Sequence, residues 1–301
     1  MADPTRIFIH AGAHRTGTSS FQQCLDINRA RLSEAGFDAA YPGRDGIAGG
    51  TLALRMPHPR HRKSPDADWV GKVRAEIARH VTAPGRALIL SEENIPGRMF
   101  HFYQGQFFPV AQRRAQVLAQ GLPGPIEHLV YVTRSYDKLF TSAYRKRAED
   151  NPVAPFYEIA AKMAAMDRGW PELVSIFQTW LKPKKFTIIE YGARGQSRDL
   201  LNRLLPDGAI PELEEPERQL NLSASDAALF ALQDKYRAGE KLERGVWQAI
   251  IADHAVAGPK DAPETAEPFA AFNDDQTAIL QQKYADDLDR IRAMNDITFI
   301  G

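Results

Sequence analysis

The feature that most constrains this fold is a short apolar segment that runs into a glycine-containing loop and then into a helical pattern. Residues 7–11 form an apolar run typical of a buried parallel strand, and the loop begins at Gly12. From Ser19 to Ala35 apolar residues recur at roughly helical spacing, and Gly36 is expected to stop the helix. Strand, glycine-containing turn and helix together are the opening unit of a parallel α/β sheet.

Buried strands and helical segments continue to alternate along the chain. Further strands are expected at 86–90, 126–133 and 185–191, with helices at 68–80, 106–119, 136–147, 156–166 and 171–181. The alternation predicts an α/β fold, a three-layer α/β/α sandwich around a central parallel sheet (P-loop NTPase-like), with 1–196 as its core. We expect 197–301 to be a mostly helical C-terminal part that packs on the core as a cap, with a linker at 258–268 and a last helix at 272–294.

Composition is that of an ordinary globular protein. The chain has 301 residues, of which 44% are hydrophobic and 25% charged, enough for one large α/β domain. The 38 Lys and Arg residues balance 38 Asp and Glu residues, so charge gives no argument for a nucleic-acid partner. A single cysteine, Cys24, excludes a disulfide framework and a multi-cysteine metal site. Without a signal-peptide pattern or an apolar run of membrane-spanning length, we expect a cytoplasmic protein with no transmembrane segment, which could still bind a membrane peripherally.

The loop from Gly12 to Ser20 has the composition of an anion cradle. Gly12 and Gly17 allow close backbone approach, and a helix starting near Thr18 directs free N–H groups and its positive dipole end at an anion. Thr18, Ser19 and Ser20 add hydroxyl donors. A strand-to-helix turn without a ligand uses the same residue types, but two glycines, a basic residue and three hydroxyls together favour a bound anion.

The loop differs from an ATP-binding loop at one decisive position. Its glycine spacing matches the start of G-x-x-x-x-G-K-[ST], but Thr18 stands where that motif has lysine. Kinases and ATPases use this lysine on the β- and γ-phosphates, so its absence argues against ATP hydrolysis. The cation of this loop is Arg15, inside the loop itself.

The loop resembles the 5′-phosphosulfate loop of sulfotransferases that use 3′-phosphoadenosine 5′-phosphosulfate (PAPS), above all their bacterial, carbohydrate-type branch. It reads His10-Ala-Gly-Ala-His-Arg-Thr-Gly-Thr-Ser-Ser-Phe-Gln22. The resemblance implies a single sulfotransferase-like domain, 1–301, whose loop binds the sulfate end of PAPS through Arg15, Thr16, Gly17, Thr18, Ser19 and Ser20. The family lysine falls on Arg15, which keeps the charge and can contact two oxygens but is bulkier and less suited to donate a proton.

A second motif of the family follows the strand at 126–133. Family members place an arginine at a strand end and a serine eight residues later on the 3′-phosphate, and Arg134 and Ser142 match this pattern. Ligands of doubly wound sheets bind at the carboxyl ends of such strands, and a guanidinium with a hydroxyl suits a dianionic phosphate. Taken alone, an arginine there more often pairs with a carboxylate. A weaker resemblance at 217–223 either brings Arg218 to the cofactor or is a surface loop before a capped helix.

Sulfuryl transfer also needs a base that takes the proton of the acceptor. In the family a Glu or His ends the strand between the two phosphate motifs, and here Glu92 and Glu93 follow the strand at 86–90. Alternation points only one of them into the cleft, Glu92 by preference, unless the pair is simply an exposed acidic loop. His14 could contact the sulfate or the acceptor, or only pack the loop. The scattered histidines lack carboxylates at ligand spacing, so we expect no metal.

Residues 41–66 predict a long surface loop rich in Gly, Pro, Arg and His, a kind of loop that is often functional or mobile. Four basic residues either form a lid for an anionic acceptor or are solvated; they are Arg55, Arg60, Arg62 and Lys63. The leading hypothesis is an enzyme, a PAPS-dependent sulfotransferase with a small-molecule, carbohydrate or lipid-headgroup acceptor. The alternatives are a P-loop-type small-molecule kinase and a non-catalytic relative that binds a phosphorylated ligand. The oligomeric state stays open.

Overall fold

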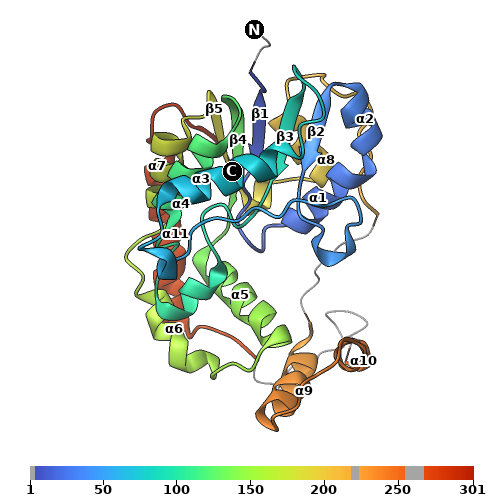
Figure 1. Ribbon diagram of the computed structural model, residues 1–301. Helices are drawn as coiled ribbons and strands as arrows, with labels where there is room; N and C mark the ends of the chain where they lie inside the picture. Colours follow the sequence, from blue (N-terminus) through green and yellow to red (C-terminus); the bar gives the residue numbers. More distant parts are fainter. Residues whose placement is uncertain (1–3, 218–223, 255–267) are drawn as a thin grey trace.

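One parallel sheet organises the computed structural model, which describes residues 4–217, 224–254 and 268–301 (Figure 1). Its six strands lie in the order β2-β3-β1-β4-β5-β6, and every neighbouring pair is parallel. The strands are β1 (Ile7–His10), β2 (Phe37–Ala40), β3 (Ala87–Ser91), β4 (Ile126–Thr133), β5 (Lys185–Glu190) and β6 (Thr298–Ile300). All residues of β1 and β3 are buried, as expected for central strands covered on both faces.

Alternate residues of the strands enter two separate hydrophobic cores. Ile7 and Ile9 of β1 belong to the core on one face, and Phe8 belongs to the core on the other face. The first face carries α3 (Asp66–Ala78), α4 (Ala111–Gly121), α7 (Trp170–Leu181) and α11 (Asp274–Arg292); the second carries α1 (Thr18–Ile27), α2 (Arg29–Glu34) and α8 (Ser197–Leu204). The predicted three-layer α/β/α sandwich is therefore confirmed.

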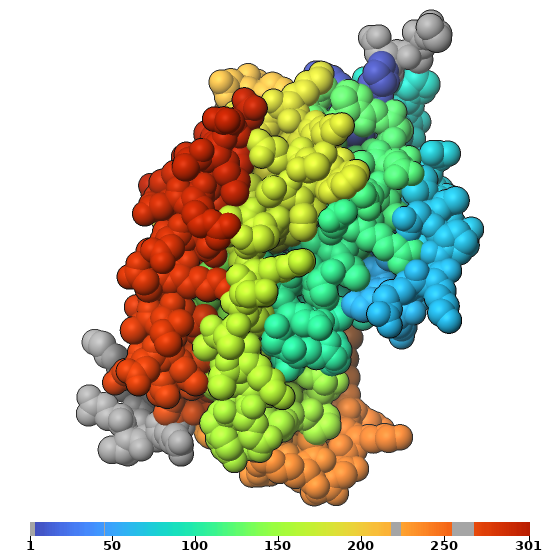
Figure 2. Space-filling model, turned by 90° about the vertical axis from the view of Figure 1, so that its left-hand side faces the viewer, coloured from blue at the N-terminus to red at the C-terminus, as the bar shows by residue number. Residues whose placement is uncertain are grey.

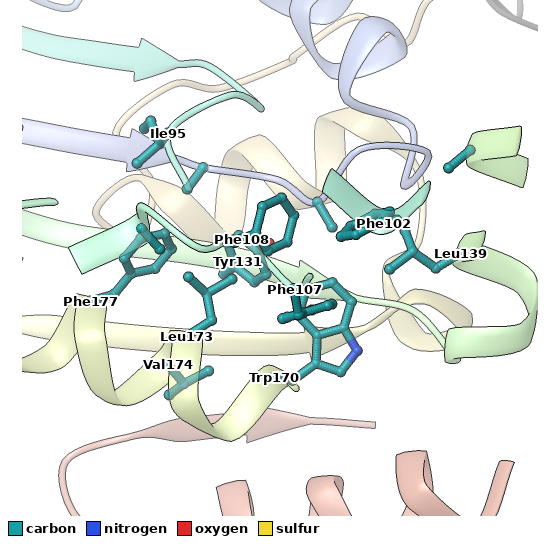
Figure 3. Close-up of a cluster of buried hydrophobic side chains, with 14 of the residues drawn as sticks. Ile95, Phe102, Phe107, Phe108, Tyr131, Leu139, Trp170, Leu173, Val174 and Phe177 are labelled. Carbon is teal, nitrogen blue, oxygen red and sulfur yellow. The ribbon is translucent and has the colours of Figure 1, made fainter. Parts of the chain in front are cut away.

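The first core contains a dense group of aromatic rings. Figure 3 shows Tyr131 of β4 beside Trp170 and Phe177 of α7, with ring centroids 5.7 and 5.6 Å apart, distances typical of edge-to-face pairs. Phe107 packs edge-on against Trp170 at 5.0 Å. These rings fix α7 against the strand whose carboxyl end leads to Arg134, and so they fix the position of that arginine.

Two strands were missed in the sequence, and two helix predictions need correction. The edge strands β2 and β6 lie in stretches to which the sequence assigned no element. The helix predicted from Ser19 to Ala35 is two helices that meet at Asn28. The helix predicted at 106–119 begins only at Ala111, after the 3₁₀ helix η3 (Met99–Gln104).

The C-terminal part is mostly helical but is more than a cap. Beyond the carboxyl edge of the sheet, α9 (Asp226–Arg237) packs against α5 (Tyr136–Asp150), and α10 (Arg244–Asp253) packs against α9 (Figure 1). Helix α6 (Phe156–Ala164) packs against η3. Figure 2 shows the red C-terminal segment lying along the yellow-green helix α7. Strand β6 pairs with β5, so the end of the chain completes the sheet. Nearly all of the predicted linker at 258–268 lies outside the described residues. No helix in the described ranges has the length and apolarity needed to cross a bilayer.

Residues 41–66 are tied to the body of the protein. The segment contains two short 3₁₀ helices, η1 (Arg44–Gly46) and η2 (Pro59–His61), and buries Leu52 and Met56 in the first core. The buried guanidinium of Arg114 donates to Pro57 O at 2.6 Å and to Ile95 O at 3.0 Å. A carbonyl oxygen of the segment accepts a hydrogen bond from a buried arginine, and two of its apolar side chains are buried in the first core. The predicted loop is therefore a packed part of the fold. Four of its basic side chains, those considered for a lid, are exposed: Arg55, Arg60, Arg62 and Lys63.

Candidate functional site

The loop between β1 and α1 lies at the carboxyl edge of the sheet, where parallel α/β folds bind ligands. Its backbone is left-handed at Gly12 (φ 39°), Arg15 (φ 62°) and Gly17 (φ 83°). A Cβ atom on Gly12 would lie 2.6 Å from Thr18 Oγ1 and 2.9 Å from the ring of His10. Position 12 therefore requires glycine, and the loop closes tightly over the end of β1 with the first N–H groups of α1 directed along the helix axis.

The hydroxyl groups of the loop divide into two sets. Thr16 Oγ1 donates to Ala13 O at 2.6 Å, and Thr18 Oγ1 donates to the same oxygen at 3.3 Å. Both threonines are buried, so their hydroxyls hold the loop in its turn. Ser19 and Ser20 are half-buried in the first turn of α1, where their hydroxyls and backbone N–H groups could reach an anion.

The two phosphate motifs predicted from the sequence meet in one cluster. Arg15 Nε donates to Ser142 Oγ at 2.8 Å, across 127 residues of sequence. Arg134 Nη1 donates to Arg15 O at 2.6 Å, and Trp170 Nε1 donates to Arg134 O at 3.0 Å. The structure thus brings Arg15, Arg134 and Ser142 together beside the start of α1.

The charge of Arg134 has no carboxylate partner, because no described residue forms an ion pair with it. Burial lowers the pKa of Arg134, with a smaller contribution in the same direction from Arg15. Its guanidinium lies over the ring of Tyr191, 4.9 Å from the centroid, and that ring is 42% exposed. Two cations, an α-helix N-terminus and an accessible aromatic ring form a cluster suited to an anionic ligand.

The acidic pair after β3 is joined to the 41–66 segment by one arginine. Arg44 contacts Glu92 Oε2 at 2.9 Å and Glu93 Oε1 at 2.7 Å. Glu92 Oε1 also accepts from the backbone and side chain of Asn94, at 2.9 and 2.8 Å. The side chain of Glu92 is only 3% exposed, compared with 17% for Glu93. Glu92 therefore organises the turn after β3, and Glu93 is the more accessible of the two carboxylates.

His14 connects the loop to the acidic turn. Its Nε2 lies 3.1 Å from Gly97 O, and its Nδ1 lies 3.7 Å from Glu93 Oε1. The side chain is 6% exposed, and its two contacts hold the loop against the turn after β3. Beneath the loop, Ser91 Oγ lies 3.1 Å from His10 Nδ1, and burial, together with the charge of Arg194, lowers the pKa of His10 to about 3.

Two residues of this site were not identified in the sequence. Arg44 lies in a segment without periodicity, and only the folded chain shows that it contacts the acidic pair. Tyr191 directly follows β5, the neighbour of β4, so its place at the carboxyl edge was a usable signal. Arg218, in contrast, lies outside the described residues. Within the described part of the chain, no three His, Cys, Asp or Glu side chains gather in a way that could hold a metal ion.

Comparisons with known proteins give a structural likeness but no family. No family model matches the chain, and no curated protein matches it. A crystal structure of a sulfotransferase from Alicyclobacillus acidocaldarius aligns with 82% of this chain and 100% of its own, at 11% sequence identity and a TM-score of 0.36.

Proposed function

We propose that this protein is a PAPS-dependent sulfotransferase. The observation that carries the proposal is the junction of Arg15, Arg134 and Ser142 beside the N-terminus of α1. Two motifs 119 residues apart meet there, and a cluster with this excess of positive charge is suited to a polyanionic nucleotide.

Each part of the cluster has a distinct task in this proposal. The first turn of α1, with Ser19 and Ser20, would hold the 5′-phosphosulfate, and Arg134 with Ser142 would hold the 3′-phosphate. Tyr191 offers a ring on which a nucleobase can stack. When bound, PAPS supplies the sulfuryl group that is transferred to the acceptor. Arg15, whose Nε donates to Ser142 Oγ, would stabilise the negative charge that develops during transfer.

The accessible carboxylate of Glu93 is our candidate for the general base. It would take the proton from an acceptor hydroxyl or amine, while the new bond to sulfur forms and the bond between sulfur and the 5′-phosphate breaks. The products of the reaction are the sulfated acceptor and adenosine 3′,5′-bisphosphate. Acceptors of the proposed reaction are small molecules, carbohydrates or lipid headgroups.

A kinase is the less favoured alternative. Thr18 stands at the lysine position of an ATP-binding loop, and its hydroxyl donates to Ala13 O inside the loop. The loop therefore offers neither the lysine that ATP-binding loops place on the β- and γ-phosphates nor a free hydroxyl at that position.

Calorimetric titration with adenosine 3′,5′-bisphosphate, and separately with ATP and Mg²⁺, tests the proposal. We expect the bisphosphate to bind and Arg134→Ala to weaken its binding at least tenfold, since hydrogen bonds to charged groups contribute about 1.5–3 kcal/mol each. The melting temperature without ligand should change little, because Arg134 has no ion pair among the described residues to lose. Arg79→Ala, at an exposed arginine of the α3 C-cap, is the matched control. Absence of bisphosphate binding, or tighter binding of Mg-ATP, would contradict the proposal.

A further inference from the structure

The connection between β5 and α8 places a third arginine on the loop. After η4 (Tyr191–Ala193) the side chain of Arg194 lies against Gly17, the N-cap of α1. A Cβ atom on Gly17 would lie 2.8 Å from Arg194 Cζ and 3.0 Å from each terminal nitrogen, so the guanidinium covers the Cα of this glycine. A side chain at position 17 would occupy this space, so the guanidinium of Arg194 can lie here only because residue 17 is glycine.

The guanidinium of Arg194 has weak partners for a largely buried cation. Nη2 donates to Ser197 Oγ at 3.0 Å and to Gly17 O at 3.3 Å, and Nη1 donates to Gly195 O at 3.4 Å. All three acceptors are neutral. Nε is buried and has no hydrogen-bond partner among the described residues. Burial lowers the pKa of Arg194.

The nearby carboxylate of Glu215 does not compensate this charge by direct contact. Its two oxygens accept from the backbone nitrogens of Ser197 and Arg198 at 3.0 and 2.7 Å, and no described residue forms an ion pair with Arg194. By contrast, the buried arginine Arg114 donates to carbonyl oxygens from all three of its side-chain nitrogens, so no nitrogen of its guanidinium lacks a partner. A partly buried positive charge with only neutral hydrogen-bond acceptors, next to a helix N-terminus, destabilises the folded protein, and an anion bound there would remove this destabilisation.

We propose that Arg194 is a further nucleotide-binding residue, which contacts the 5′-phosphate side of the ligand from the α8 side of the loop. On the other side of the loop, towards α5, the side chain of Arg15 contacts Ser142, and Arg134 contacts the backbone of Arg15. Figure 1 shows α8 beside α1, so the two groups of cations flank the start of α1. The inference rests on the proposed function, because it assumes that a nucleotide phosphate occupies this loop.

The test is a titration of four proteins with two nucleotides, adenosine 5′-monophosphate and adenosine 3′,5′-bisphosphate. The proteins are the wild type, Arg194→Ala, Arg134→Ala and the control Arg198→Ala, which removes an exposed cation of α8 that makes no contact with Gly17. We expect Arg194→Ala to weaken both nucleotides by the same factor, about tenfold or more. Arg134→Ala should weaken the bisphosphate far more than the monophosphate, and Arg198→Ala should leave both within about twofold.

Thermal unfolding without ligand separates a binding role of Arg194 from a structural role. Because the guanidinium has no ion pair among the described residues, the melting temperature of Arg194→Ala should equal or exceed that of the wild type. A clearly lower melting temperature would mean that Arg194 is structural and would overturn the inference. Unchanged affinity of Arg194→Ala for both nucleotides would overturn it as well, and would leave the proposed function standing if the wild type binds the bisphosphate. A loss confined to the bisphosphate would refute the placement on the 5′ side. If the wild type binds neither nucleotide, the proposed function fails and the inference fails with it.

Discussion

Two adjacent glutamates of this protein have different surroundings and should respond differently to the same substitution. Glu92 is enclosed by Arg44 and Asn94, whereas Glu93 is partly exposed and bonded to Arg44 through one oxygen. Glutamine keeps the shape of both side chains but cannot accept a proton. Glu93→Gln should therefore lower the transfer of labelled sulfate from PAPS to acceptors in an extract of the native cell about 100-fold or more, with little change in stability.

The matched variant Glu92→Gln should show the opposite pattern. It leaves the charge of Arg44 only partly compensated and weakens a buried hydrogen-bonded turn, so we expect a loss of about 1–3 kcal/mol in the free energy of unfolding. Urea titration of both variants measures this difference. If both variants lost the same amount of transfer activity and the same free energy of unfolding, the two glutamates would not have the separate roles assigned here.

At the scale of elements, the 41–66 segment is held by arginines of α4. Arg114 is 3% exposed. It donates to Pro57 O in the segment and to Ile95 O in the turn after β3, and so it joins two parts of the chain that are distant in sequence. Arg114→Met keeps the apolar stem but removes the donors, so it should lower the free energy of unfolding by about 3 kcal/mol. It should also release the segment, whose exposed basic side chains are trypsin sites: Arg55, Arg60, Arg62 and Lys63.

Limited trypsin digestion provides the measurement of this release. The wild type should be cut slowly within 55–63, and Arg114→Met should be cut there several-fold faster under conditions in which it remains folded. Arg74→Met is the control, because Arg74 is an exposed arginine of α3 that donates to Gln120 O outside the segment. Rapid cleavage of the wild type would contradict the packed state of the segment.

The same elements show how much of the fold and the site could be predicted from the sequence. The central strands were found because burial on both faces leaves an uninterrupted apolar run, as in 87–91 and 126–133. Strand β2 contains Asp38, whose carboxylate is held by Arg86 and Thr82, and β6 has only three residues, so neither carries a periodic signal. The site divides in the same way. Motif residues were found from local context, but the contacts of Arg44 and Arg194 exist only after the chain has folded back on itself.

On the scale of the whole molecule, distant segments are joined through buried polar groups. Tyr136 Oη donates to Asp287 Oδ2 at 2.6 Å and accepts from Trp170 N at 2.7 Å, which connects α5, α7 and α11. His128 of β4 lies 2.9 Å from Leu204 O and 2.8 Å from Thr187 Oγ1, and so connects the sheet to the end of α8. Because each such group depends on one protonation state, these connections make the stability of the whole fold depend on pH.

Two buried histidines set the direction of that dependence. Burial lowers the pKa of His128 to about 4, and burial with the charge of Arg194 lowers that of His10 to about 3, both from an ordinary value near 6.5. Below about pH 6.5 the unfolded chain therefore binds protons that the folded protein does not bind. Their contribution to stability is complete above that pH and decreases as the pH falls towards 4, by up to about 1.4 kcal/mol per pH unit for each histidine.

Urea unfolding at a series of pH values between 7.5 and 4.5 checks this expectation. The free energy of unfolding should decrease steadily below pH 6.5, and His128→Gln, which cannot take up the proton, should show a smaller slope from a lower starting stability. The exposed His254 provides the control, since His254→Gln removes a histidine outside both cores and should keep the slope of the wild type. A stability that stays constant from pH 6.5 to 4.5 would mean that His128 and His10 are solvated or protonated in the folded protein. The polar contacts that join the sheet to α8 and to the loop would then need another explanation.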